Sequence, residues 1–193
     1  MTTEENIKKA TKELLLKEGC FDLTLREISE YAKIDRTVIH YYFRSKDNLF
    51  TKVLKELLDE FMVTQYLQMS LDLSLKEKVS RYIDSADKIL VKYPYLDIYV
   101  MMQLNKNESI SYFNDSTLSF IKKIIGEIHE AIEDGNTNYK NPLHFLSDMI
   151  SLTSCPYFIL NFLGKAGLSI NENTLDTILK SRKEKIMNTL FCK

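Results

Sequence analysis

Turn-forming residues are scarce in this chain, which has only five glycines and three prolines among 193 residues. Strands need frequent turns, and turns draw on glycine and proline, so this scarcity favours helices over sheets. Apolar residues recur at spacings of three and four, the period of an amphipathic helix. The sequence therefore predicts an all-α fold of about nine helices without strands. These helices are expected near residues 4–18, 25–32, 36–43, 46–69, 74–93, 94–104, 115–134, 142–163 and from 169 onward.

Composition excludes several classes of protein. The net charge is −1, and 45% hydrophobic with 27% charged residues is typical of an ordinary soluble globular chain. Cys20, Cys155 and Cys192 are far apart, which predicts reduced thiols in a cytoplasm and neither a disulfide framework nor a metal site. The polar start MTTEEN is unlike a secretory signal, and charged or polar residues interrupt the apolar runs. We expect a cytoplasmic protein without a cofactor or a membrane span.

Two helix starts stand close together near the amino end. Thr24 and Glu27 have the spacing of a capping box, in which each side chain bonds the other residue's backbone amide. Asp35 is a suitable N-cap for the next helix. Only about three residues are left for the connection between these two short helices, which is the arrangement of a helix-turn-helix.

The stretch DRTVIHYYFRSKDNLF, residues 35–50, carries the main functional signal. Ile39 and Phe43 are one turn apart and are expected to face the core, with Val38 sharing that side. The residues left outside are Arg36, Thr37, His40, Tyr41 and Tyr42. Although the whole chain is neutral, residues 33–55 hold six basic residues against two aspartates. A short cationic region is either a solvated helix face or a footprint for phosphate.

The outward residues suit a helix lying in the major groove of DNA. Arg36 can make a bidentate hydrogen bond to guanine, and Thr37 can contact a base edge or a thymine methyl group. Tyrosine hydroxyls can reach phosphate oxygens. Lys46 stands at the start of the following helix, where free backbone amides attract phosphate. For Tyr42, burial against a neighbouring helix is the alternative.

On these residues, LLLKEGCFDLTLREISEYAKIDRTVIHYYFRSKDNLF resembles the DNA-binding domain of TetR/AcrR-family regulators. The chain departs from the family pattern at three positions. Lys33 replaces a turn glycine, and if that residue has positive φ, lysine costs roughly 1 kcal/mol there. Ser29 replaces an alanine at a helix crossing, and His40 replaces the first tyrosine of the recognition helix.

The resemblance implies an N-terminal helix-turn-helix domain over residues 1–48 and a helical effector-binding and dimerisation domain over residues 49–193. It implies phosphate contacts for Thr24, Tyr41, Tyr42 and Lys46, and base contacts for Arg36 and Thr37, with Arg26 as a third reader. His40 is a further candidate donor to phosphate. It also implies a homodimer formed through the last two helices, which presents two recognition helices to a palindromic operator.

An effector pocket is implied within the larger half of the chain. The candidate lining residues are Tyr66, Tyr82, Tyr99, Met102, Phe120, Met149 and Phe158, with His129 in the same segments. Aromatic and methionine side chains suit a small, largely apolar ligand. For each of them, packing in the core is the competing explanation, and the lone histidines are more simply structural.

The sequence therefore predicts a ligand-responsive transcriptional regulator, a repressor released from DNA by its effector. Two other classes stay open. One is an all-α enzyme, for which no catalytic motif is recognisable. The other is a module that binds a protein partner through its tyrosine-rich surface. We expect no enzymatic activity.

Overall fold

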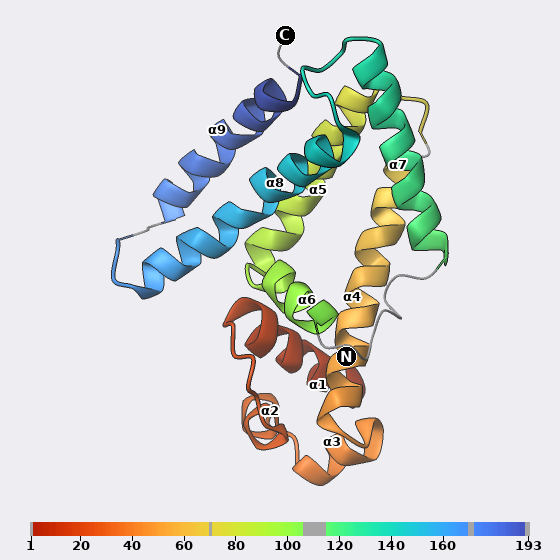
Figure 1. The fold of residues 1–193 in the computed structure, drawn as a ribbon. Coiled ribbons are helices and arrows are strands. Elements are labelled where there is room, and N and C mark those ends of the chain that lie inside the picture. Colours follow the sequence, from red (N-terminus) through yellow and green to blue (C-terminus); the bar gives the residue numbers. More distant parts are fainter. Residues whose placement is uncertain (1, 70, 106–114, 170–171, 192–193) are drawn as a thin grey trace. The chain divides into compact units, whose positions relative to one another are not determined.

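The structure is a computed structural model that describes residues 2–69, 71–105, 115–169 and 172–191. Across these residues all regular secondary structure is helical, which confirms the predicted all-α class (Figure 1). They are α1 (Thr3–Lys12), a π-helical turn (Glu13–Lys17), α2 (Leu25–Ala32), α3 (Arg36–Phe43), α4 (Lys46–Met69), α5 (Leu75–Lys92), α6 (Leu96–Asn105), α7 (Asp115–Glu133), α8 (Pro142–Lys165) and α9 (Glu172–Phe191). The connection between the helices predicted at 94–104 and 115–134 lies, apart from residue 105, outside the described residues.

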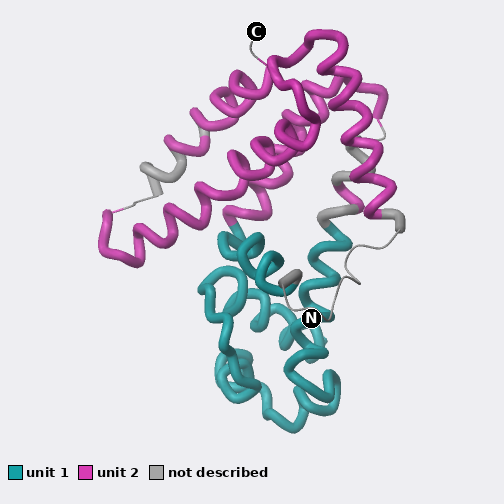
Figure 2. The backbone as a smooth tube through the Cα atoms, viewed as in Figure 1, with its two compact units in different colours: residues 1–61, 92–112 teal, residues 62–91, 113–193 magenta. Residues whose placement is uncertain are grey.

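The chain divides into two compact units (Figure 2). The N-terminal unit consists of residues 1–61 and 92–112, and the C-terminal unit of residues 62–91 and 113–193. The N-terminal unit is therefore larger than the predicted domain 1–48, because it also takes in the first part of α4 and the α6 segment. No helix of the described residues is long and apolar enough to cross a membrane.

Local sequence signals explain where the first helices begin. Thr2 and Glu5 form a capping box at α1, and Thr24 and Glu27 form a second one at α2. At α3, the Asp35 carboxylate accepts a hydrogen bond from the Thr37 amide. These caps satisfy amide groups that have no partner inside the helix. All three predicted starts are confirmed.

The buried residues of the N-terminal unit come from α1 to α4, from the π-helical turn and from the segment that leads into α6. Its fully or nearly buried residues include Ile7, Leu15, Leu16, Ile28, Ile39, Phe43, Leu49, Val53 and Tyr95. The Tyr95 amide donates to the Leu16 carbonyl at 3.0 Å. Gly19 has φ +73°, and a Cβ there would lie 3.1 Å from the Tyr95 ring. Glycine at 19 therefore satisfies both the left-handed turn after the first helix and the close approach of this ring.

The core of the C-terminal unit draws on α5, α7, α8 and α9. Its buried cluster consists of Val79, Ile83, Ile128, Phe145, Met149, Ile186 and Leu190. One prediction in this unit is wrong: the helix expected near residues 142–163 does not stop before Gly164, because α8 includes this glycine and continues to Lys165. The glycine in the left-handed region is Gly167, with φ +95°. A glycine within a helix costs only about 1 kcal/mol relative to alanine, so Gly164 alone does not stop the helix.

Candidate nucleic-acid interface

The turn between α2 and α3 places a lysine in a left-handed conformation. Lys33 has φ 54° and ψ 43°, and its amide donates to the carbonyls of Ser29 and Glu30. The Ser29 hydroxyl donates to the Ile34 carbonyl at 2.6 Å. Lys33 thus meets the condition under which the sequence predicted strain at this position. Ser29, in place of the family's alanine, adds a hydrogen bond that fastens the turn.

Helix α3 has one buried and one exposed face. Ile39 and Phe43 are buried, as predicted. Tyr41 is 71% exposed and Tyr42 is 42% exposed, so the alternative in which Tyr42 is buried does not occur. Arg36, Thr37 and His40 are also exposed. The five outward residues predicted for this helix therefore share its solvent face.

The start of α3 is held by a compact set of hydrogen bonds. The Asp35 carboxylate accepts from the Thr37 amide at 2.7 Å and from the Thr37 hydroxyl at 2.5 Å. The Thr37 hydroxyl bond is the main reason that the pKa of Asp35 is lowered. With its hydroxyl proton committed to Asp35, Thr37 keeps its methyl group and an oxygen lone pair for a ligand.

Two helix N-termini lie near each other beside α3. Glu27, in the first turn of α2, has its pKa lowered chiefly by the Thr24 amide, and the charge of Lys46 at the start of α4 adds to this effect. Ser45 caps α4, because its hydroxyl oxygen accepts from the Asn48 amide at 3.1 Å. Helix N-termini attract anions through free amides and the helix dipole. Thr24 and Lys46 thus stand at helix N-termini, and their phosphate contacts stay a prediction.

The other basic side chains of the region are exposed, and two of them, Arg26 and Lys52, are also held in ion pairs. Arg26 is exposed, and its Nε donates to Glu30 at 2.8 Å on the same helix, which raises the Arg26 pKa. Arg44, which the prediction did not name as a contact, is exposed next to α3 with φ 65°. Lys52 is engaged differently, because its Nζ lies 2.7 Å from Glu4. A place in the cationic region of residues 33–55 therefore does not by itself predict which lysines are available to DNA.

The predicted effector residues are distributed over both units. Tyr99 and Met102 belong to the N-terminal unit, where the Tyr99 ring stacks on Phe21 with 5.7 Å between centroids. Tyr82, Phe120, Met149 and Phe158 belong to the C-terminal unit. Met149 is part of the buried cluster, and Tyr82 packs against it. The side chain of Tyr66 lies outside the described residues.

The surface of the C-terminal unit has a groove. The groove, of about 510 Å³, lies between α5 and α9 and is lined by Asp84, Asp87, Lys88, Val91, Leu179 and Lys183. None of these was predicted as an effector residue. His129 is exposed, with Nε2 3.7 Å from Glu133. Within the described residues, no group of three histidine, cysteine or carboxylate side chains has a metal-binding arrangement.

Comparisons with known proteins agree with the geometry of this interface. Residues 7–53 match the family described as bacterial regulatory proteins, tetR family. A curated relative, the HTH-type transcriptional repressor NicS of Pseudomonas putida, is 35% identical over 79 residues, which are 41% of this chain and 37% of the relative. The matched region thus spans little more than a third of that repressor.

Solved structures share the fold along almost the whole chain. A mutant of the HlyIIR protein matches with a TM-score of 0.66 and 18% identity over 99% of this chain and 98% of its own. The transcriptional regulator FadR from Bacillus subtilis, in complex with stearoyl-CoA, matches with a TM-score of 0.63 and 16% identity over 96% of this chain and 98% of its own. At these identities the similarity shows the fold alone.

Proposed function

The chain belongs to the tetR family of bacterial regulatory proteins, and we propose that it is a ligand-responsive repressor that binds a palindromic operator as a homodimer. The solvent face of α3 carries this proposal. Arg36, Thr37, His40, Tyr41 and Tyr42 are all exposed there, while Ile39 and Phe43 fasten the helix from behind. The family match favours a regulator over the enzyme and the protein-binding module that the sequence left open.

We propose a division of labour among the predicted contacts. Arg36 and Thr37 at the start of α3 read base edges, with Arg26 from α2 as a third reader. Tyr41, Tyr42, Lys46 and the Thr24 end of α2 hold phosphates, and His40 donates to the same backbone.

Dimerisation through α8 and α9 is supported by apolar exposure on α8. Leu143, Ile150, Leu152, Phe158, Ile159 and Phe162 are all exposed in the single chain. Contiguous exposed apolar surface marks interaction sites, and these residues supply the apolar side chains for one. A two-fold dimer would present two copies of α3 to the two halves of a palindrome.

A small, largely apolar effector completes the proposal. The similar FadR structure was solved with stearoyl-CoA, which makes acyl compounds the first to test. An effector that favours a dimer geometry unsuited to the operator would release the protein from DNA. Such a regulator would act in the cytoplasm, on the DNA it controls.

The contact assignments are tested by two matched substitutions. The operator is selected from a random duplex pool with the purified protein, and binding is measured by fluorescence anisotropy across a salt series. Arg36→Ala is expected to weaken binding and relax preference at one base position, because a bidentate contact contributes about 1–3 kcal/mol of discrimination. Lys46→Ala is expected to weaken binding to all sequences alike and to reduce the salt slope by about one per subunit. An equal loss of specificity in both variants would contradict the assignment.

A further inference from the structure

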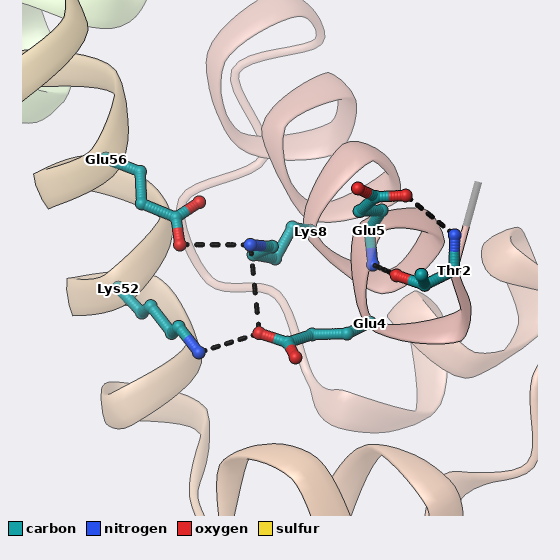
Figure 3. A network of polar contacts seen from close by, with 6 residues as sticks. All are labelled: Thr2, Glu4, Glu5, Lys8, Lys52 and Glu56. Atoms are coloured by element: carbon teal, nitrogen blue, oxygen red, sulfur yellow. Dashed lines mark hydrogen bonds and ion pairs between the residues drawn. The ribbon is translucent and has the colours of Figure 1, made fainter.

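Four charged residues connect α1 to α4 inside the N-terminal unit (Figure 3). Lys52 Nζ lies 2.7 Å from Glu4 Oε1, and Lys8 Nζ lies 3.0 Å from Glu56 Oε1. Lys8 Nζ also lies 3.7 Å from Glu4 Oε1, which joins the two pairs. We call Glu4, Lys8, Lys52 and Glu56 the charge ladder. Each helix contributes two members, one turn apart, so the ladder has two rungs.

The order of charges in the ladder opposes a slide of one helix along the other. The first rung runs from an acid on α1 to a base on α4, and the second from a base on α1 to an acid on α4. A slide by one turn in one direction would set Lys8 against Lys52, and in the other direction Glu4 against Glu56. Like charges at this distance repel, so the alternating order favours a single register.

The pairs are partly protected from solvent, which strengthens them relative to a fully exposed pair. The Lys8 side chain is 18% exposed and the Lys52 side chain 48% exposed. The hydrogen bond from Lys52 is the largest cause of the lowered pKa of Glu4, and the same bond raises the pKa of Lys52. Both groups are thus held in their charged forms by each other.

The ladder is adjacent to the anchor of the recognition helix. Lys52 Nζ lies 5.6 Å from the ring centroid of Phe43, a distance at which a cation is attracted to an aromatic face. Phe43 is the buried last residue of α3. Only Arg44 and Ser45 separate α3 from α4, and the Ser45 amide donates to the Phe43 carbonyl at 2.7 Å. A shift of α4 on α1 would therefore carry α3 with it.

We propose that the charge ladder sets the register of α4 on α1 and thereby the placement of α3 for DNA binding. Its members are positioning residues that act on DNA affinity without touching DNA. This inference rests on the proposed function. The competing explanation for Lys52 is a direct phosphate contact, because it belongs to the basic cluster of residues 33–55.

Charge reversal separates positioning from direct contact. The variants are Lys52→Glu alone and the full inversion Glu4→Lys, Lys8→Glu, Lys52→Glu and Glu56→Lys, which keeps every pair and the net charge. The probe is the operator duplex selected with the wild-type protein. Lys55→Glu is the control, since Lys55 is exposed on the same helix outside the ladder. Lys52→Gln and Lys55→Gln form a neutral pair that avoids introducing repulsion.

Lys52→Glu is expected to weaken operator binding roughly ten-fold or more relative to Lys55→Glu, because a lost ion pair is worth up to about five-fold per subunit and the reversal adds repulsion. The full inversion is expected to recover affinity to within about three-fold of wild type, since it restores all pairs. Lys52→Gln is expected to leave the salt slope of binding unchanged, whereas loss of a phosphate contact would reduce it by about 0.9 per subunit.

The outcomes separate the ladder from the proposed function. An inverted protein that binds as weakly as Lys52→Glu, or a salt slope that falls in Lys52→Gln, would overturn the positioning role while wild type still binds its operator. A wild-type protein that retains no duplex from the pool would instead overturn the proposed function, and the ladder's role in DNA binding with it.

Discussion

Arg44 is the residue where the backbone of the N-terminal unit is most unfavourably placed. Its φ is 65° and its ψ is −43°, which lies outside the left-handed helical region that Lys33 occupies. The Ser45 amide donates to the Phe43 carbonyl, so Arg44 is the central residue of a γ-turn. A γ-turn with positive φ at its centre is rare and strained. The Arg44 side chain is exposed. The strain therefore arises from the backbone and the Cβ atom rather than from packing.

Replacing Arg44 by glycine should stabilise the protein. A non-glycine residue in such a conformation costs on the order of 1–3 kcal/mol, and glycine adopts it without that penalty. Against this gain stands the greater conformational entropy of glycine in the unfolded chain, about 0.5–1 kcal/mol. The net expectation is about 1 kcal/mol of added unfolding free energy, or an increase of roughly 3 °C in Tm for a chain of this length.

Urea and thermal unfolding of Arg44→Gly and Arg44→Ala would measure this directly. Alanine keeps the Cβ and the strain while it removes the same guanidinium, so the difference between the two variants isolates the backbone effect. The free energy of unfolding of Arg44→Gly is expected to exceed that of Arg44→Ala by about 1 kcal/mol. A difference within about 0.3 kcal/mol, or a glycine variant less stable than the alanine variant, would refute the assignment of strain to this turn.

Two further predictions concern the C-terminal unit. Lys78 is 7% exposed, and its Nζ lies 2.8 Å from Glu127. Glu127→Gln should therefore leave a buried charge unpaired and lower the free energy of unfolding in urea by about 3 kcal/mol, whereas the double variant Lys78→Met with Glu127→Leu should leave it nearly unchanged. Similar losses of unfolding free energy in both variants would contradict this. Burial, and then the hydrogen bond to Asp148, raises the pKa of Tyr139 to about 12. Since the native state holds this proton more tightly, the associated stability is present below about pH 10 and is lost between about pH 10 and 12. Tyr139→Phe should flatten that part of the stability profile, and an unchanged profile would count against the bond.

Local signals made the helices around the candidate interface predictable from sequence. Thr24 with Glu27, and Asp35 before α3, are caps whose partners lie within three residues, so their effect does not depend on the rest of the fold. The alternation of Ile39 and Phe43 with the exposed tyrosines follows from the helical period alone. These are the contacts that place the candidate interface.

Contacts between distant parts of the chain were not predictable in the same way. Lys52 belongs to the basic cluster, yet it pairs with Glu4, a residue 48 positions away. A count of charges along the sequence cannot tell Lys52 from Lys46. Only the three-dimensional fold shows that Lys52 is paired with a carboxylate of another helix. The effector residues pose the same problem, because aromatic residues at helical spacing can equally form a core. Met149 shows this, since it lies in the buried cluster of the C-terminal unit.

The middle of α8 shows how far such long-range contacts can change the meaning of a residue. Pro156 has no amide proton, so it cannot donate to the carbonyl one turn before it. Next to that carbonyl, the Thr153 carbonyl accepts from Arg182 of α9. The guanidinium also lies 4.8 Å from the Tyr157 ring and 3.9 Å from Asp87 of α5, which accepts from the Tyr157 hydroxyl at 2.6 Å. A segment that reads as plain apolar core is thus joined to two other helices by polar groups. Arg182 lies 29 residues from Thr153, and Asp87 lies 70 residues from Tyr157, so no local sequence pattern could have indicated these contacts.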